Sequence, residues 1–289
     1  MPVSSPALSL CMIVKNEERD LARCLDSVAS LRAEIVIVDT GSQDATREIA
    51  ASYSANVYPF EFTVVNFAAA RNHGLARASG RWIMVLDADE ILDQVSVPLI
   101  RELVSRDENA GYYFERWNHQ PGEARPMPDH VVRLFPNRPD YRYRGRVHET
   151  VDVSIRAGGG RLIPTSIRID HAFASDPEAR RQKNLWYIGI LNEEIAANPA
   201  DTSRLDFLAA EYHQLGMFDR ASEIADRIAQ VRPLDPKAHL HAGVYHLLYK
   251  ADPARARADF LEALRLRPKF AEAQSFLELV DEQERAALR

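Results

Sequence analysis

The sequence has only two cysteines among its 289 residues, Cys11 and Cys24. Both fall within apolar patterns, and so few thiols argue against a disulfide-rich secreted fold, so we expect both to be buried and reduced. No hydrophobic run is long enough to cross a bilayer, because the apolar stretch at residues 7–14 has about eight residues and a spanning helix needs about 20. The same stretch lacks the cationic start and the cleavage site of a signal peptide. These absences predict a cytoplasmic protein without a transmembrane segment.

An excess of positive charge is absent as well. The chain has 36 Lys and Arg against 42 Asp and Glu, a formal net charge of −6, and this balance provides no field that attracts nucleic acid. In one segment Arg142, Arg144 and Arg146 alternate with Tyr141 and Tyr143. Proteins that bind single-stranded nucleic acid combine basic and aromatic residues in this way. Alternation along a strand would place the three arginines on one face, where they serve an anionic acceptor or are simply solvated. Because no RNA-binding motif accompanies them, we predict no nucleic-acid partner.

Hydrophobic residues, in contrast, make up 46 % of the chain and follow two periods in its first ninety residues. Short apolar runs rich in Val and Ile predict strands, and amphipathic segments between them predict helices. The four predicted strands are residues 8–14, 34–39, 55–59 and 82–86. Such alternation predicts an α/β domain with a mostly parallel sheet covered on both faces, which binds ligands beyond the carboxyl ends of its strands.

Residues 110–175 change character, since shorter strand patterns alternate with Pro, Gly and Asn clusters. The predicted strands of this part are residues 112–117, 131–135, 141–147 and 162–169. We expect them to extend the first sheet with antiparallel strands, which makes the sheet a mixed one.

From about residue 176 the pattern is helical throughout, and it repeats. Pro199, Pro233 and Pro268 lie 34 and 35 residues apart, each at the close of an amphipathic helix. A period of 34 residues in helix pairs resembles the tetratricopeptide repeat, with a capping helix at 271–286. A generic helical bundle is the alternative. We therefore predict two domains, the α/β domain at residues 1–175 and an all-α tetratricopeptide-like domain at residues 176–289.

Acidic residues stand at the ends of two predicted strands. Asp39 closes the second strand, and Asp87 and Asp89 follow the fourth. Two carboxylates at i and i+2 after a strand can share one hard cation, because Mg²⁺ and Mn²⁺ prefer oxygen ligands and leave room for diphosphate oxygens. The alternative is that Asp89 and Glu90 only cap a following helix. The second acidic strand end, 48 residues earlier in the chain, favours a metal and phosphate site.

Four segments resemble, in order and at similar spacing, the motifs of family 2 glycosyltransferases with the GT-A fold. They are Ser-Leu-Cys-Met-Ile-Val-Lys-Asn-Glu-Glu (9–18), Ile-Val-Asp-Thr-Gly-Ser-Gln-Asp (37–44), Phe-Ala-Ala-Ala-Arg-Asn (67–72) and Leu-Asp-Ala-Asp-Glu (86–90). Two later segments resemble a branch of that family with tetratricopeptide tails, which includes bacterial peptide S-glycosyltransferases and lipopolysaccharide-core glucosyltransferases. These segments are Gly-Arg-Val-His-Glu (145–149) and Ile-Asp-His-Ala-Phe (169–173). The resemblance implies a GT-A, Rossmann-like nucleotide-sugar domain.

The resemblance also implies a donor-binding role for each matching residue. Asp39 would accept a hydrogen bond from the nucleotide base, and Lys15 and Glu17 would lie against the base and the ribose. Arg71 would offer its planar fork to the nucleotide or its diphosphate, a geometry for which arginine is suited; the alternative is a surface arginine. Asp87 would hold the ribose or a metal-bound water.

The implied cation is Mn²⁺ or Mg²⁺, bound directly by Asp89, and it would neutralise the leaving diphosphate. A second metal ligand is implied at His171, at the junction with the helical domain. His148 competes with it, because this chain has His-Ala-Phe where the branch commonly has His-Gly-Tyr.

The acceptor needs a base, because family 2 enzymes invert the anomeric centre in a single displacement. Many members place this base in a Glu-Asp pair, which this sequence lacks. Glu149, after the Tyr-Arg-Tyr-Arg segment, is the first candidate and Asp129 the second; the alternative for Glu149 is a surface or helix-capping acid. A thiol acceptor would need less help from a base.

The sequence thus predicts an inverting glycosyltransferase that uses a UDP-sugar, with a glucose-type sugar favoured, and a peptide, protein or glycan acceptor. Three alternatives stay open. They are a lipopolysaccharide-core glycosyltransferase whose repeats are structural support, an inactive glycosyltransferase fold that serves as a binding scaffold, and a nucleotidyltransferase. The last would normally have a Gly-rich basic loop where this chain has Lys15 to Glu18. A homodimer is neither favoured nor excluded.

Overall fold

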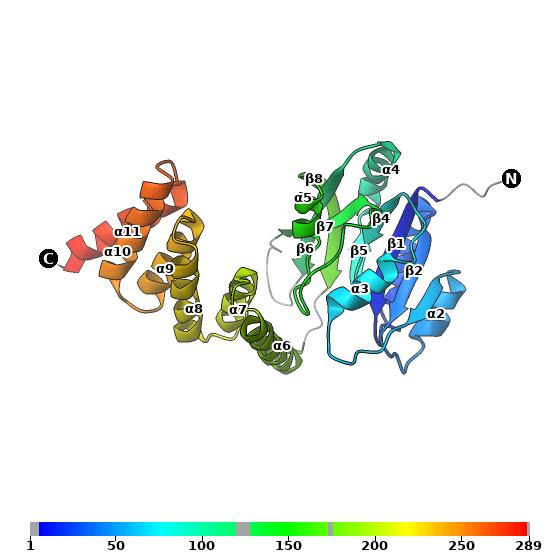
Figure 1. The fold of residues 1–289 in the computed structure, drawn as a ribbon, viewed down its shortest axis with the longest axis horizontal. Coiled ribbons are helices and arrows are strands. Elements are labelled where there is room, and N and C mark those ends of the chain that lie inside the picture. Colours follow the sequence, from blue (N-terminus) through cyan, green and yellow to red (C-terminus); the bar gives the residue numbers. More distant parts are fainter. Residues whose placement is uncertain (1–5, 120–127, 173–175, 288–289) are drawn as a thin grey trace. The chain divides into compact units, whose positions relative to one another are not determined.

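The computed structural model describes residues 6–119, 128–172 and 176–287, and the chain divides into two compact units, Met1–Ser175 and Asp176–Arg289 (Figure 1). The first unit is an α/β unit built on one sheet. Its strands are β1 (Leu8–Val14), β2 (Glu34–Asp39), β3 (Asn56–Pro59), β4 (Trp82–Val85), β5 (Glu90–Leu92), β6 (Ala110–His119), β7 (Pro128–Pro136) and β8 (Arg161–Ala172). Its helices are α1 (Leu21–Val28), α2 (Thr46–Ser52), α3 (Phe67–Leu75), α4 (Val97–Ser105) and α5 (Asp152–Ala157), with short 3₁₀ turns at Ala29–Leu31 and Gln94–Ser96.

The sheet has eight strands in the order β3-β2-β1-β4-β7-β6-β8-β5. Strands β1 to β4 pair in parallel, whereas β7 joins β4 and β6 in antiparallel fashion and β5 pairs antiparallel with β8. This mixed α/β sheet confirms the predicted fold class. One pairing differs from the expected antiparallel extension, because β6 and β8 run parallel.

The predicted strand at residues 141–147 is wrong. Its backbone forms only an isolated bridge between Arg144 and Thr150. The amide of Arg142 donates to Ser154 Oγ and that of Tyr143 to Asn72 Oδ1, so side chains take the place of a neighbouring strand. Alternating burial of aromatic residues produced a strand-like pattern here, because side chains in a loop can pack on the core without joining the sheet.

Helices cover both faces of the sheet, as its pattern predicts. Leu10 and Met12 of β1 face the core formed with α1, α2 and α4, whereas Cys11 faces the core formed with α3 and α5. The period-2 alternation of a strand assigns these neighbours to opposite faces. Both cysteines are buried and free, with exposed fractions of 5 % and 0 % for Cys11 and Cys24. Burial raises the pKa of the Cys11 thiol to about 12.

The second unit is all-helical. Its helices are α6 (Pro177–Ala197), α7 (Ser203–Gln214), α8 (Phe218–Val231), α9 (Pro236–Leu248), α10 (Pro253–Leu266) and α11 (Ala271–Ala287). The three repeat prolines each follow a helix by two residues, at the ends of α6, α8 and α10. At Gly243 a Cβ atom would lie 2.6 Å from the ring of Phe260, so the glycine permits α9 and α10 to approach closely. Within the described part of the chain, none of the helices is both long and apolar enough to span a membrane.

Candidate active site

The central feature of the site is the turn that follows β4. Asp87 and Asp89 lie on this turn with side chains 32 % and 40 % exposed, and Glu90 begins β5 with its side chain fully buried. The backbone amide of Glu90 donates to Asp87 O at 3.0 Å. In return, Glu90 Oε2 accepts from the amide of Asp87 at 3.0 Å. Glu90 begins a strand and closes the turn. The alternative that Asp89 and Glu90 only cap a following helix is therefore wrong.

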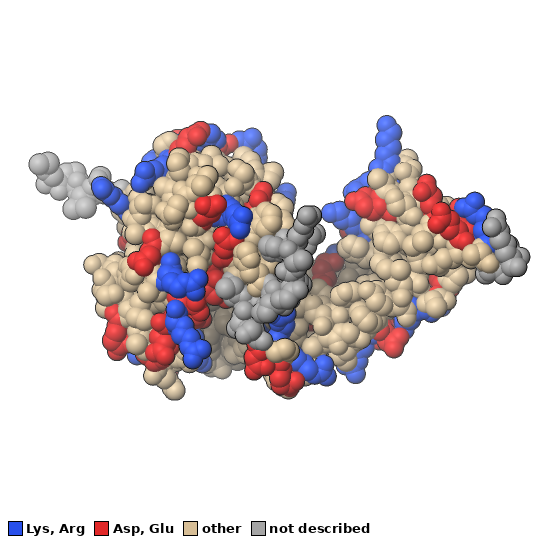
Figure 2. Space-filling model, turned by 180° about the vertical axis from the view of Figure 1, so that it is seen from behind, with Lys and Arg blue, Asp and Glu red and all other residues tan. Residues whose placement is uncertain are grey.

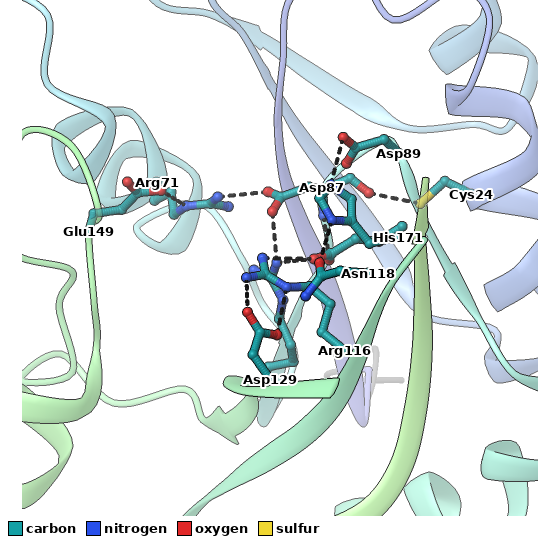
Figure 3. Close-up of polar contacts among 11 residues, drawn as sticks. Cys24, Arg71, Asp87, Asp89, Arg116, Asn118, Asp129, Glu149 and His171 are labelled. Carbon is teal, nitrogen blue, oxygen red and sulfur yellow. Dashed lines mark hydrogen bonds and ion pairs between the residues drawn. The ribbon is translucent and has the colours of Figure 1, made fainter. Parts of the chain in front are cut away.

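Two arginines hold the carboxylate of Asp87. Arg71 Nη2 lies 2.7 Å from Oδ1 (Figure 3). Arg133 Nη2 lies 2.7 Å from Oδ2. Burial alone would raise the pKa of Asp87, but the charges of Arg133 and Arg71 outweigh it and hold this pKa well below its ordinary value. Asp87 is therefore an anion whose charge is already compensated by protein cations.

Arg71 joins Asp87 to the candidate base. Its Nε donates to Glu149 Oε1 at 2.6 Å, and the side chains of Arg71 and Glu149 are only 9 % and 12 % exposed. Figure 3 shows the guanidinium lying between the two carboxylates. The alternative of a surface arginine is wrong, because α3 directs this residue inward over the ring of Tyr143, at 5.4 Å from its centroid. Glu149 itself lies in the loop before α5 and not at the end of a strand.

The candidate metal ligands lie side by side. Asp89 Oδ2 and His171 Nε2 are 3.1 Å apart, although 82 residues separate them in the chain. The pairing of β5 with β8 produces this contact, since Glu90 stands opposite His171. The other ring nitrogen, Nδ1, faces Asn118 Oδ1 at 2.8 Å and is thereby fixed in orientation. The competing residue His148 has a left-handed backbone with φ 48° in the loop before Glu149. Phe173, part of the matching segment, lies outside the described residues.

The two loops after β1 and β2 are fastened to each other. The amide of Asn16 donates to Ser42 Oγ at 3.0 Å and that of Glu17 to Thr46 Oγ1 at 2.7 Å. Lys15 is exposed at the start of the first loop. Asp39, which the sequence predicts to bind the nucleotide base, is only 1 % exposed. Its carboxylate accepts a hydrogen bond from the amide of Ser42 at 2.9 Å and pairs with Arg47. Burial raises the pKa of Asp39, but these hydrogen bonds and Arg47 bring it below its ordinary value.

Glu17, which the sequence predicts to lie against the nucleotide, has a raised pKa. Partial burial, followed by the negative charges of Asp89, Asp20 and Asp87, raises the pKa of Glu17 from 4.5 to about 7. Glu17 therefore lies within electrostatic reach of the Asp87 to Glu90 turn. The structure thus gathers the loop after β1 and the turn after β4 at one edge of the sheet, as expected for parallel strands.

The Glu17→Gln variant should be more stable than the wild type above pH 7, because burial and the nearby acids disfavour the ionised carboxylate of Glu17 in the folded state. We expect a difference of about 1–2 kcal/mol, since solvent screens part of the effect at this half-buried side chain. The native state binds the Glu17 proton more tightly than the unfolded state, so wild-type stability falls as pH rises from 4.5 through about 7. The amide has no proton to lose, so the difference should vanish below pH 4.5. Urea unfolding above pH 7 and below pH 4.5 measures the difference in stability between the variant and the wild type. The control is Glu48→Gln, at an exposed glutamate. A difference that is the same at both pH values would contradict the raised pKa.

Asp129, the second candidate base, forms a bidentate pair with Arg116 at 3.0 and 2.5 Å. The sequence argument missed three residues that contact the site: Arg133 and Glu90 as partners of Asp87, and Asn118 as the partner of His171. A signal for Arg133 was present, since a single arginine interrupts the apolar strand Val131 to Phe135. A charge there needs a partner, because burying an unpaired one is costly.

A mixed α/β sheet with a carboxylate turn after β4, joined to a histidine from β8, is the architecture expected for a nucleotide-sugar domain. The chain belongs to glycosyl transferase family 2, whose model matches residues 9–170. This confirms the family that the sequence motifs predicted.

Individual proteins are similar to this chain over different shares of its length. A TPR repeat-containing protein of Synechococcus elongatus is 40% identical over 150 residues, which are 52% of this chain and 36% of that protein. The lipopolysaccharide core biosynthesis glycosyltransferase LpsC of Rhizobium meliloti is 36% identical over 165 residues, 53% of this chain and 60% of LpsC. Among solved structures, S. aureus TarS 1–349 in complex with UDP-GlcNAc aligns over 97% of this chain and 92% of that one, at 14% identity and a TM-score of 0.49. The matching segments span about a third of the Synechococcus protein and three fifths of LpsC.

Proposed function

We propose that the protein is an inverting glycosyltransferase that transfers a sugar from a UDP-sugar, with glucose-type sugars favoured, in a reaction assisted by Mn²⁺ or Mg²⁺. The observation that carries the proposal is the contact of Asp89 with His171 beside Asp87, at the carboxyl end of β4. Family membership supports a nucleotide-sugar donor, and ligands of such sheets bind at this edge. On one visible face, drawn in Figure 2, acidic and basic side chains of the described residues are interspersed.

The residues present fit a cation with a small protein ligand set. An octahedral ion with bonds of about 2.1 Å separates neighbouring ligands by about 3.0 Å, close to the 3.1 Å between Asp89 Oδ2 and His171 Nε2. The contact of Nδ1 with Asn118 is the kind of second contact that orients a metal-bound histidine. Among the residues that the structure describes, no group of three or more His, Cys, Asp or Glu is arranged so that it could hold a metal ion, so the protein would supply only these two ligands. Diphosphate oxygens would complete the coordination, as is usual for these ions.

Each residue then has a chemical task. Asp89 and His171 would hold the cation, which supplies positive charge to the leaving diphosphate. Glu149 would take the proton of the acceptor, with Arg71 holding its Oε1 and leaving Oε2 for the acceptor. Asp87 would hold the ribose while its arginine partners fix its orientation, and Asp39, Lys15 and Glu17 would form the pocket of the nucleoside.

A donor-hydrolysis screen across nucleotide sugars, with Mn²⁺ and with EDTA, tests the proposal. We expect hydrolysis of a UDP-sugar only with the cation, and calorimetry should show that UDP binds at least about tenfold more tightly with Mn²⁺, a difference of about 1.4 kcal/mol. Equal affinity in both conditions would remove the cation from the site. Binding without hydrolysis or transfer would instead favour the inactive scaffold.

For the acceptor we propose a peptide or protein, docked on the helical unit. An aromatic cluster there joins His213, Phe218, Tyr245 and Tyr249. Tyr249 is 37 % exposed and stacks on Phe218 with ring centroids 4.1 Å apart. Exposed aromatic residues of this kind are common anchors for binding partners. A glycan acceptor is the second candidate, favoured by the lipopolysaccharide-core name of the relative LpsC.

The Tyr249→Ala variant should raise the KM for a peptide acceptor about fivefold to tenfold, since an anchoring aromatic typically contributes more than about 1 kcal/mol. Donor hydrolysis should stay unchanged. The matched control is Leu234→Ala, which alters a side chain 77 % exposed in the same unit. Donor hydrolysis and transfer measured side by side decide the matter. If both fall in parallel, the helical unit is structural support and a glycan acceptor becomes the better proposal.

A further inference from the structure

A buried ion pair underlies the turn after β4, and the proposed chemistry uses Arg133 only as a partner of Asp87 and gives Glu90 no task. Glu90 is fully buried and pairs with Arg133, whose side chain is 7 % exposed. A second arginine, Arg116, places Nη1 3.6 Å from the same carboxylate oxygen.

Stability does not explain the pair. Desolvating two charges costs several kcal/mol per ion, and replacing a buried pair by apolar residues is often neutral or stabilising. Arg133 Nε adds to the cost, because this buried atom has no hydrogen-bond partner within the described part of the chain. A buried ion pair of a kind that is often neutral in net stability, placed under the turn of the candidate site, favours a geometric role.

The contacts of the pair define that role. Glu90 Oε2 binds the amide of Asp87 while Oε1 pairs with Arg133, and Arg133 in turn binds Asp87 Oδ2. Arg133 thus fixes both the backbone and the side chain of Asp87. Strand pairing brings in the other half of the site, since the backbone of Glu90 lies opposite His171 in the β5–β8 ladder. Through β7, which pairs with β4, Arg133 anchors this assembly to the centre of the sheet.

We propose that Arg133 and Glu90 are positioning residues that hold Asp87 and Asp89 at a fixed separation from each other and from His171. They act through the turn and have no contact with the donor. This inference rests on the proposed glycosyl transfer, because the readout of position is the rate of donor cleavage. Small displacements of groups that orient a reaction can lower its rate on the order of 10²-fold.

The test compares Arg133→Met, Glu90→Gln and the double variant with the wild type. Met removes the charge of Arg133, and Gln keeps an oxygen that can accept from the amide of Asp87. Arg133→Met leaves the buried charge of Glu90 with Arg116 alone, at 3.6 Å, and Glu90→Gln leaves Arg133 with Asp87 and without its buried partner. Each single change should therefore lower the melting temperature. The double variant removes both charges and should recover nearly wild-type melting, while its kcat for donor hydrolysis stays at least about tenfold low with little change in KM. Arg133→Lys, which keeps the charge without the fork, should recover only part of kcat.

The matched control is Arg168→Met with Asp170→Asn, an ion pair on β8 whose side chains are 39 % and 33 % exposed. It should leave both melting temperature and kcat unchanged. If kcat of the Glu90 and Arg133 double variant returns together with its stability, the pair is merely structural and the inference is overturned.

A ligand-free measurement separates this inference from the proposed function. Amide hydrogen exchange across residues 86–90 should be faster in the double variant than in the wild type, although the two are equally stable. If the wild type hydrolyses no donor, the proposed function fails, and the exchange experiment still decides the positioning role. Equal exchange in both proteins would overturn it.

Discussion

The Asp89→Asn variant is expected to lower the rate of donor hydrolysis by about 10²–10³-fold, the usual effect of removing one group that stabilises charge in a transition state. Asparagine keeps the size and one oxygen of the side chain but loses the negative charge that a hard cation requires. Asp89 is 40 % exposed and its ion-pair contact is with His171. The fold should therefore lose little, and the melting temperature should change by no more than a few degrees.

Steady-state hydrolysis and UDP binding with Mn²⁺ measure this effect. The matched control is Asp170→Asn, because Asp170 neighbours His171 in sequence and pairs with Arg168 and His119. The control should retain wild-type rates. If both asparagine variants lose activity equally, the loss reflects a general disturbance where β5 pairs with β8 and not the loss of a cation ligand. A wild-type rate in Asp89→Asn would remove this residue from the cation site and leave His171 without its proposed partner.

The parts of the site that sequence could predict are those set by local pattern. Four short apolar runs predicted β1 to β4 to within one or two residues. Because parallel strands end at the same edge of a sheet, the carboxylates at the ends of β2 and β4 could then be predicted to lie at that edge. The contact of Asp89 with His171 could be expected only from the family resemblance. Its physical cause is the antiparallel pairing of β5 with β8, a partner choice that no local pattern specifies.

What sequence could not predict is which charges neutralise each other. Arg71 was expected to face phosphate, yet its nearest anions are Asp87 and Glu149, brought together from 16 and 78 residues away. The apolar run around Arg133 signals that this arginine needs a partner, but it does not identify Glu90, because an ion pair between two strands depends on sheet order. The aromatic alternation at residues 141–147 predicted a strand where the structure has a loop. Alternate residues of a loop can be buried in the same way as alternate residues of a strand.

The Arg71→Met variant is expected to destabilise the protein by about 3 kcal/mol, the lower end of the cost of breaking a buried ion pair. The methionine fills much of the same volume but leaves the carboxylate of Glu149, which is 12 % exposed, without its cation. Asp87 keeps Arg133 and is 32 % exposed, so water offsets part of its loss. Hydrolysis should fall as well, because Asp87 and Glu149 both lose an orienting partner.

Urea unfolding of three variants beside the wild type separates the two effects of Arg71. Arg77→Met, at an exposed arginine just after α3, is the control and should change stability by less than about 0.5 kcal/mol. Adding Glu149→Gln to Arg71→Met removes the stranded charge and should restore at least half of the lost stability. Transfer should not recover in this double variant, because the proposed base is then absent. Stability that fails to recover would show that packing over Tyr143, and not the ion pair with Glu149, is what Arg71 contributes to the fold.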